Sequence, residues 1–233
     1  MSWIKKVLGI KPVYPAKSYW LEYDHFFDHP DPKKHLFRNK RMVVLDTETT
    51  GLNPTTDRLL SIGAVAVKDQ QIYVGDRFEA FFSNEGLYQA KERESVPVHG
   101  ILQKHWAQLP DNQKILIDLL AYLKDSIIVG HHIAFDFAML NNAFMAQLGG
   151  PLQNQVLDTA HLAQRLASPF AAYQAAPQEI GQYSLDQLCK VYNIPVEGRH
   201  TASGDAMLTA LLLVKLLGRL EQRGVKTLKD LLR

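Results

Sequence analysis

The sequence contains one cysteine, Cys189, so the chain cannot form an internal disulfide. Its place in the segment LDQLC predicts a small buried core residue. A chain without disulfides fits the reducing cytoplasm, where we expect this protein to act. The sequence also lacks the Cys/His spacing of a zinc site and the glycine-rich loop of a Walker A nucleotide site. These absences exclude a disulfide scaffold, a zinc module and a P-loop enzyme.

Long apolar runs are missing as well. No stretch approaches the ~20 residues that a membrane-spanning helix needs, and residues 1–10 lack the apolar region and cleavage site of a secretory signal. We therefore expect no membrane contact. The sequence also lacks a large excess of charge of one sign, because its net charge is only +2. Any binding of nucleic acid must then be local rather than a bulk-charge effect.

Residues 1–40 differ in composition from residues 41–233, which suggests an N-terminal extension followed by one α/β domain. The extension is rich in aromatic and basic residues, and plain disorder is usually poor in aromatics. One interpretation is that its aromatics pack on the domain, and we favour this. The alternative is an arm that binds nucleic acid or a protein partner, since basic and aromatic residues together suit phosphates and stacked bases. The aromatic residues are Trp3, Tyr14, Tyr19, Trp20, Tyr23, Phe26, Phe27 and Phe37.

Apolar patterns in the domain predict alternating strands and helices. The first three strands have short linkers, so they are expected to form an antiparallel meander. Two segments carry little periodicity, 83–110 and 168–182, and the length of the second suggests a lid or a partner contact. Strands are expected at 42–46, 59–67, 71–82, 126–130 and 156–158, and helices at 111–123, about 136–148, 159–167, 185–192 and about 202–221, with one more short helix in the tail, 224–233.

The stretch MVVLDTETTG, residues 42–51, carries two acids at the end of an apolar strand. Side chains alternate along a strand, so Asp46 and Glu48 lie on one face, roughly 6.5 Å apart. Two such carboxylates repel each other, and a divalent cation removes that repulsion. Oxygen ligands favour Mg²⁺ or Mn²⁺. By itself the pair is weak evidence, because acids in solvated turns and caps are common.

Two further acids and a histidine strengthen the metal hypothesis. Asp136 follows the strand at 126–130 and opens a helix, while Asp205 lies in the first turn of the last long helix. His200 can approach Asp205 if it lies just before that helix, with Thr201 or Ser203 as the N-cap. Helix capping would explain both acids equally well. A four-carboxylate cluster, however, can hold two ions, and histidine titrates where it can accept a proton from water.

The segments DTETTG (46–51), HHIAFD (131–136) and HTASGD (200–205) resemble the three motifs of the DEDDh 3′→5′ exonucleases. The most similar branch is the proofreading epsilon subunits of bacterial DNA polymerase III, and VHGI at 98–101 resembles a further family segment. Together the motifs cover residues 40–222 in the family's order. His132 departs from the pattern, since the family usually has asparagine there. The chain also ends soon after the last motif, which favours an exonuclease that is free-standing or tethered differently from epsilon.

The resemblance implies a ribonuclease-H-like fold, a mixed five-stranded sheet flanked by helices. It also implies two divalent ions, Mg²⁺ or Mn²⁺, held by Asp46, Glu48, Asp136 and Asp205, with His200 as general base. The substrate would be the 3′ end of single-stranded DNA, released as nucleoside 5′-monophosphates. Residues that would contact the terminal nucleotide are Thr47, Thr49, Val98, His99 and Phe135, although a structural role for His99 is equally consistent with the sequence.

Two alternatives remain open at this stage. The same motifs resemble ribonuclease T and oligoribonuclease, so the substrate could be the 3′ end of RNA. The other alternative is a catalytically idle protein that binds nucleic-acid ends through its basic and aromatic extension. Presence of all four acids and of His200 argues against the idle protein.

Overall fold

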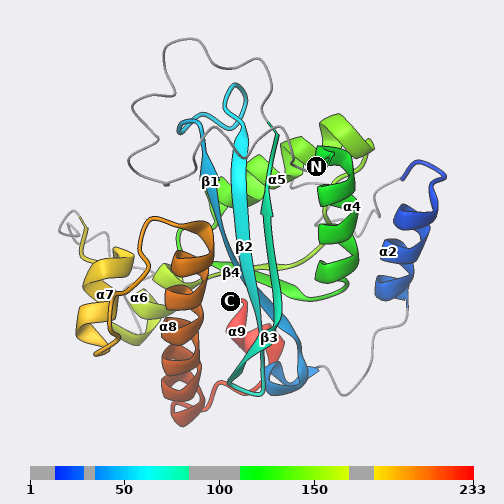
Figure 1. Ribbon diagram of the computed structural model, residues 1–233. Helices are drawn as coiled ribbons and strands as arrows, with labels where there is room; N and C mark the ends of the chain where they lie inside the picture. Colours follow the sequence, from blue (N-terminus) through cyan, green and yellow to red (C-terminus); the bar gives the residue numbers. More distant parts are fainter. Residues whose placement is uncertain (1–13, 29–34, 84–110, 168–180) are drawn as a thin grey trace.

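A computed structural model describes residues 14–28, 35–83, 111–167 and 181–233 (Figure 1). Of the two aperiodic segments predicted at 83–110 and 168–182, residues 84–110, with Val98 and His99, and residues 168–180 lie outside the described residues. One mixed sheet forms the centre, in the strand order β3-β2-β1-β4-β5. Its strands are β1 (Met42–Thr49), β2 (Leu59–Lys68), β3 (Gln71–Phe81), β4 (Ile127–Gly130) and β5 (Val156–Asp158).

The meander expected for the first three strands is confirmed, because β1 pairs antiparallel with β2 and β2 pairs antiparallel with β3. β4 and β5 continue the sheet in parallel. This mixed five-stranded arrangement is the fold that the sequence predicts. β1 lies at the middle of the sheet, and its acids therefore occupy the centre of the molecule.

The helices also agree with the periodicity, and Thr201 rather than Ser203 caps the last long one by accepting a hydrogen bond from Gly204 N at 3.1 Å. Two elements were not predicted, α2 and a short 3-10 helix. The helices are α2 (Ser18–Asp28), η2 (Phe37–Asn39), α4 (Asn112–Leu123), α5 (Ala134–Leu148), α6 (Thr159–Ala167), α7 (Leu185–Val191), α8 (Ala202–Gln222) and α9 (Leu228–Leu231). Among the helices described, none combines the length and apolar character required to cross a membrane.

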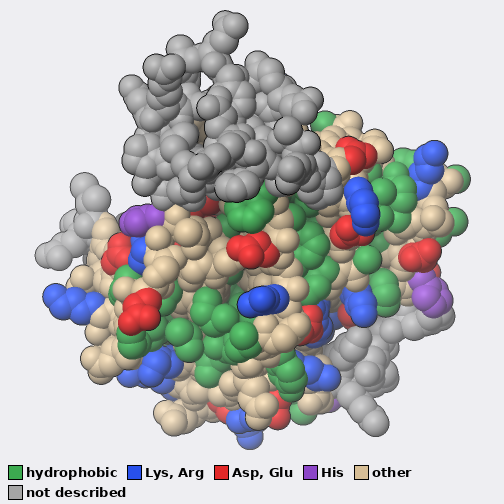
Figure 2. Space-filling view, viewed as in Figure 1, with side chains coloured by type: hydrophobic (Ala, Val, Ile, Leu, Met, Phe, Trp, Pro, Cys, Tyr) green, Lys and Arg blue, Asp and Glu red, His purple; other side chains and the backbone are tan. Residues whose placement is uncertain are grey.

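Helices cover the sheet on both faces, which explains why its central strands are continuously apolar. Along β1, Val43 and Leu45 face α4 and α5, whereas Met42 and Val44 face α6, α7 and α8. Figure 1 shows α8 running along one side of the sheet and α4 along the other. On the face in Figure 2, acidic and basic side chains are interspersed rather than separated by sign. This agrees with the low net charge.

Helix α2 packs on the α4–α5 side of the sheet, so most aromatic residues of segment 14–28 join the core, while Phe26 stays exposed. Trp20 is fully buried, and its indole Nε1 donates to Leu148 O at 2.8 Å. Tyr23 is also buried and donates from its hydroxyl to Asn154 Oδ1 at 2.6 Å. Asn154 in turn donates to the backbone carbonyls of Lys124 and Ser126. The packing interpretation is therefore confirmed for residues 14–28.

Replacing Trp20 by alanine should test whether α2 belongs to the folded unit. The change removes a fully buried ring and its hydrogen bond, so we expect a loss of about 3–5 kcal/mol in the free energy of unfolding, measured by urea denaturation. Leu21 is the matched control, because its side chain is 64% exposed on the same helix. Leu21→Ala should change stability by less than about 0.5 kcal/mol. Equal, small effects of the two variants would show that α2 is not part of the cooperative unit.

Candidate metal centre

Three carboxylates meet where β1 passes the start of α8. Asp46 and Glu48 leave β1 on the face that α8 covers, and Asp205 comes from the first turn of α8. One oxygen from each of the three lies within 4.8 Å of the others. An all-oxygen set at this spacing suits Mg²⁺ or Mn²⁺. The expected convergence of residues from two distant segments is therefore present in the structure.

A glycine on the neighbouring strand allows this approach. Gly63 of β2 pairs with Asp46, and a Cβ atom at position 63 would lie 2.3 Å from Ser203 N and 2.4 Å from the carbonyl carbon of Ala202. Any side chain there would push the start of α8 away from the sheet. Ser203 adds a second fixing contact, since its hydroxyl donates to Glu79 Oε1 on β3 at 2.5 Å. The backbone thus brings Asp205 to the two acids of β1.

The electrostatics of the cluster favour a cation. Burial raises the pKa of Asp46 to about 9, with further contributions from the charges of Asp136, Asp205 and Glu48. Burial, then Asp205 and Asp136, raise the pKa of Glu48 to about 7. The site is therefore costly to ionise without a positive charge. Asp205 Oδ1 is buried and forms an ion pair with Arg199 Nη1 at 2.6 Å, so the site already attracts one positive charge. These observations fit a divalent cation.

Asp136 stands apart from the three-acid group and is held by the strand beside it. Thr47 donates to Asp136 Oδ1 twice, from its backbone N at 3.0 Å and from its hydroxyl at 2.6 Å. Burial raises the pKa of Asp136 to about 6, and the two bonds from Thr47 oppose that rise. Thr47 is thus buried and occupied in positioning Asp136. A contact between Thr47 and substrate remains a prediction, as does a metal role for Asp136.

His200 lies immediately before the N-cap of α8, as expected. It is exposed and has a φ of 65°, a left-handed conformation that is uncommon outside glycine. Such strained backbone often occurs at functional sites. The position leaves the imidazole open to solvent beside the start of the helix that carries Asp205. Its role as general base remains a prediction.

The backbone conformation at His132 accounts for the asparagine that the exonuclease motif usually has at this position. His132 has a φ of 55°, a region where asparagine is favoured over most residues. Its backbone N donates to Asp158 Oδ1 at 3.2 Å, and the same oxygen accepts from Ala160 N at 2.8 Å. Asp158 therefore caps the start of α6. His131 approaches Thr159 instead, with Nδ1 2.9 Å from Oγ1.

The remaining predicted contacts are less defined by the structure. Thr49 donates from its hydroxyl to Gly51 O at 2.8 Å, which fixes the turn after β1. Phe135 is half-buried and packs against the core on the α5 side. Neither observation tests a contact with a nucleotide.

Sequence reasoning gave no role to Arg199. Its Nη1 lies 2.6 Å from Asp205 Oδ1, and its Nε and Nη2 donate to the two oxygens of Asp186 at 2.7 and 3.1 Å. The charge of Arg199 also lowers the pKa of Asp46 and Glu48, against the larger effect of burial. The signal available in the sequence was its position directly before His200. Pairing with an acid on another helix could not be read from that position.

A model of the family described as Exonuclease (RNase_T) matches residues 43–213. PolC-type DNA polymerase III of Caldanaerobacter subterraneus is 26% identical over 230 residues, which cover 96% of this chain and 15% of the relative. The PolC-type polymerase of Bacillus subtilis is 30% identical over 192 residues, covering 82% of this chain and 12% of the relative. The chain therefore spans a small part of these relatives.

Among solved structures, E. coli exonuclease I in complex with a dT13 oligonucleotide has a TM-score of 0.64 at 16% identity, covering 80% of this chain and 43% of that one. The cell-death related nuclease CRN-4 has a TM-score of 0.58 at 14% identity, covering 78% of this chain and 64% of that one. At these identities the likeness concerns the fold.

The pKa values of the acids predict how the stability of the metal-free protein depends on pH. With the pKa of Asp46 at about 9 and that of Glu48 at about 7, the folded state binds more protons than the unfolded chain between about pH 4 and pH 9. Stability should therefore fall as pH rises through this interval. We expect a Tm several degrees lower at about pH 8.5 than at about pH 5.5 in EDTA. Added Mn²⁺ should restore most of the difference.

Asp46→Asn is the control for this measurement, because it removes the group with the largest rise in pKa. The variant should show a flatter dependence of Tm on pH and a weaker response to Mn²⁺. A slope and a Mn²⁺ response equal to those of the natural protein would contradict the assignment of the effect to this cluster.

Proposed function

The chain belongs to the exonuclease family whose model matches residues 43–213, and on this premise we propose that it removes nucleotides from the 3′ end of single-stranded DNA. The observation that carries the proposal is the group of Asp46, Glu48 and Asp205, whose oxygens lie within 4.8 Å of one another. Chemistry of this family depends on two divalent metal ions, and the cluster suits the metals that hydrolyse phosphodiesters.

In the proposed mechanism Asp46, Glu48 and Asp205 would hold the metal ions, with Asp136 as a fourth acid fixed by Thr47. Bound divalent ions would polarise the phosphoryl oxygens and lower the pKa of the attacking water. His200 accepts a proton from that water as its oxygen attacks the terminal phosphorus. The bond from phosphorus to the 3′ oxygen of the preceding nucleotide breaks, and that oxygen takes up a proton. The products are a shortened strand and a nucleoside 5′-monophosphate.

DNA is the proposed substrate because the relatives with the matching segment are DNA polymerases, and exonuclease I was solved with a DNA oligonucleotide. Such a site recognises the 3′ terminus of a strand rather than its base sequence, so little base specificity is expected. An RNA substrate is the second candidate, and the 2′-hydroxyl is the feature that would distinguish the two. The binding of Thr49, Phe135, Val98 and His99 to the terminal nucleotide is proposed with the same function.

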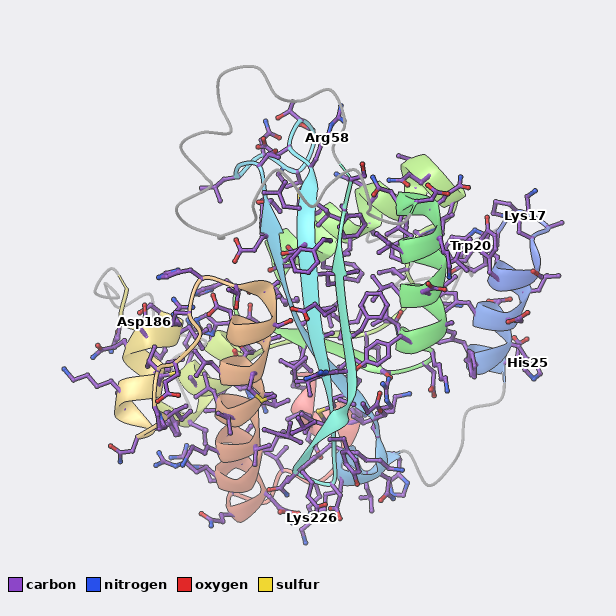
Figure 3. All side chains as sticks on the ribbon, in the orientation of Figure 1. Lys17, Trp20, His25, Arg58, Asp186 and Lys226 are labelled. Carbon is purple, nitrogen blue, oxygen red and sulfur yellow. The ribbon has the colours of Figure 1, made fainter. Side chains whose placement is uncertain are left out.

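We further propose that residues 41–233 form the catalytic domain and residues 1–40 an extension to it. Support comes from the contacts of α2, which buries Trp20 and Tyr23 against the α4–α5 side, away from the helix that carries Asp205 (Figure 3). This arrangement favours a packing role for residues 14–28 over a role in binding the substrate. A protein partner for other parts of residues 1–40 stays a prediction.

A time course on a strand labelled at its 5′ end tests the function directly. DNA and RNA of matched sequence should be compared with Mg²⁺, with Mn²⁺ and with EDTA. We expect a ladder that shortens from the 3′ end, faster on DNA, and its loss in EDTA. Asp46→Ala should lower the rate by at least about 1000-fold, because the metal contributes several kcal/mol to the transition state. A faster RNA ladder would reassign the substrate, and absence of any ladder would favour the idle end-binding protein.

Replacing His200 by alanine tests the general base separately. General-base catalysis contributes about 10²–10⁴-fold, so kcat should fall by that amount while the Mn²⁺ dissociation constant changes little. His25→Ala is the matched control, because His25 lies on α2 at the far side of the molecule (Figure 3). A His200→Ala variant that keeps its kcat would show that another group takes the proton.

A further inference from the structure

Arg199 connects the metal centre to a neighbouring helix. One edge of its guanidinium, Nε and Nη2, binds the carboxylate of Asp186 on α7, and Nη1 lies 2.6 Å from Asp205 Oδ1 on α8. The Arg199 side chain is 20% exposed and that of Asp205 is 12% exposed, whereas that of Asp186 is 61% exposed. The inner contact is therefore the more shielded from solvent, and the outer one fixes the direction of the guanidinium.

The positive charge of Arg199 acts on the whole cluster. It forms an ion pair with Asp205 and also opposes the effect of burial on the pKa of Asp46 and Glu48. Against three clustered carboxylates it supplies one unit of positive charge. Arg199 therefore already supplies part of the stabilisation that a divalent cation would give to this metal centre.

A cation bound by Asp205 would have to share that carboxylate with the guanidinium. The contact at 2.6 Å involves Oδ1, which is also the buried oxygen of Asp205 that accepts no hydrogen bond from the described residues. Two positive groups on one carboxylate repel each other strongly where water is partly excluded. Metal binding must then either tolerate this repulsion or displace the guanidinium from Asp205.

We propose that Arg199 is a built-in counter-cation, which occupies Asp205 in the metal-free protein and gives way when a metal ion binds. It thereby lowers the affinity of the centre for divalent ions and stabilises the acids when no ion is present. Asp186 is the positioning residue that holds Arg199 in reach of Asp205. This inference rests on the proposed function, because it requires that the three acids bind a metal.

The direct test is a Mn²⁺ titration followed by electron paramagnetic resonance, which needs no substrate and no turnover. Arg199→Gln removes the competing charge, so the Mn²⁺ dissociation constant should fall about tenfold. Asp186→Asn removes the contact that holds the guanidinium in reach of Asp205, so the constant should fall as well, by about threefold. In the Arg199→Gln background, Asp186→Asn should change it by less than about twofold, since the two residues act through one contact.

Tighter Mn²⁺ binding by both single variants is the signature of the proposal. A merely structural role for Arg199 would weaken Mn²⁺ binding in both, because Asp205 would lose its position. Weaker or unchanged binding by Arg199→Gln would thus overturn the counter-cation. Should Arg199→Gln fail to fold, Asp186→Asn decides alone, since its side chain is 61% exposed. Unchanged or weaker Mn²⁺ binding by that variant would then overturn the proposal.

Arg38 supplies a matched control elsewhere in the chain. It likewise bridges two acids, Asp69 and Glu221, and Glu221 lies 16 residues beyond Asp205 on α8, which corresponds to about 24 Å. Arg38→Gln should leave the Mn²⁺ dissociation constant unchanged.

Asp46→Asn should abolish the high-affinity Mn²⁺ signal. If the natural protein shows no saturable Mn²⁺ binding, the metal centre itself is refuted. If the natural protein binds Mn²⁺ but Arg199→Gln does not bind it more tightly, only the role of Arg199 is refuted.

Discussion

Repulsion among carboxylates at the end of β1 is the constraint on which the rest of this structure depends. Burial and neighbouring charge together raise the pKa of Asp46 to about 9, so the folded protein holds these acids close at a cost to its own stability. The surrounding core has to outweigh that cost. Both faces of the sheet are covered by helices and the central strands are buried, which gives a rigid frame that keeps like charges together.

A different structural feature places each acid at the site. β1 carries two of them by simple alternation, α8 brings Asp205 because Gly63 has no side chain to block its first turn, and Thr47 holds Asp136 from the other face of the same strand. Thr47 lies between the two metal-facing acids of β1, so one strand serves both faces of the sheet at the centre. Along β1, the acids that face the metal site therefore alternate with Thr47, which positions Asp136.

The sequence predicted the antiparallel meander of the first three strands, most helix boundaries and the acids, because apolar periodicity and motif spacing are local signals. Apart from the convergence of the acids, it did not predict contacts between distant segments. Thr47 and Asp136 are 89 residues apart, and Arg199 meets Asp186 only because α7 and α8 pack together. Helix α2 was missed because its aromatic residues face the core without a strong helical pattern of their own. The left-handed backbone at His132 and His200 leaves no clear trace in side-chain chemistry.

The contacts of α2 also bear on the order in which the molecule assembles during translation. Trp20 and Tyr23 reach partners 128 and 131 residues later in the chain, and these partners leave the ribosome well after α2. At about 5–20 residues per second, the delay is roughly 6–26 s. During that time the aromatic side of α2 has no surface to cover it. Docking of the N-terminal helix is therefore a late event, and a nascent chain exposes this apolar stripe until Asn154 has emerged.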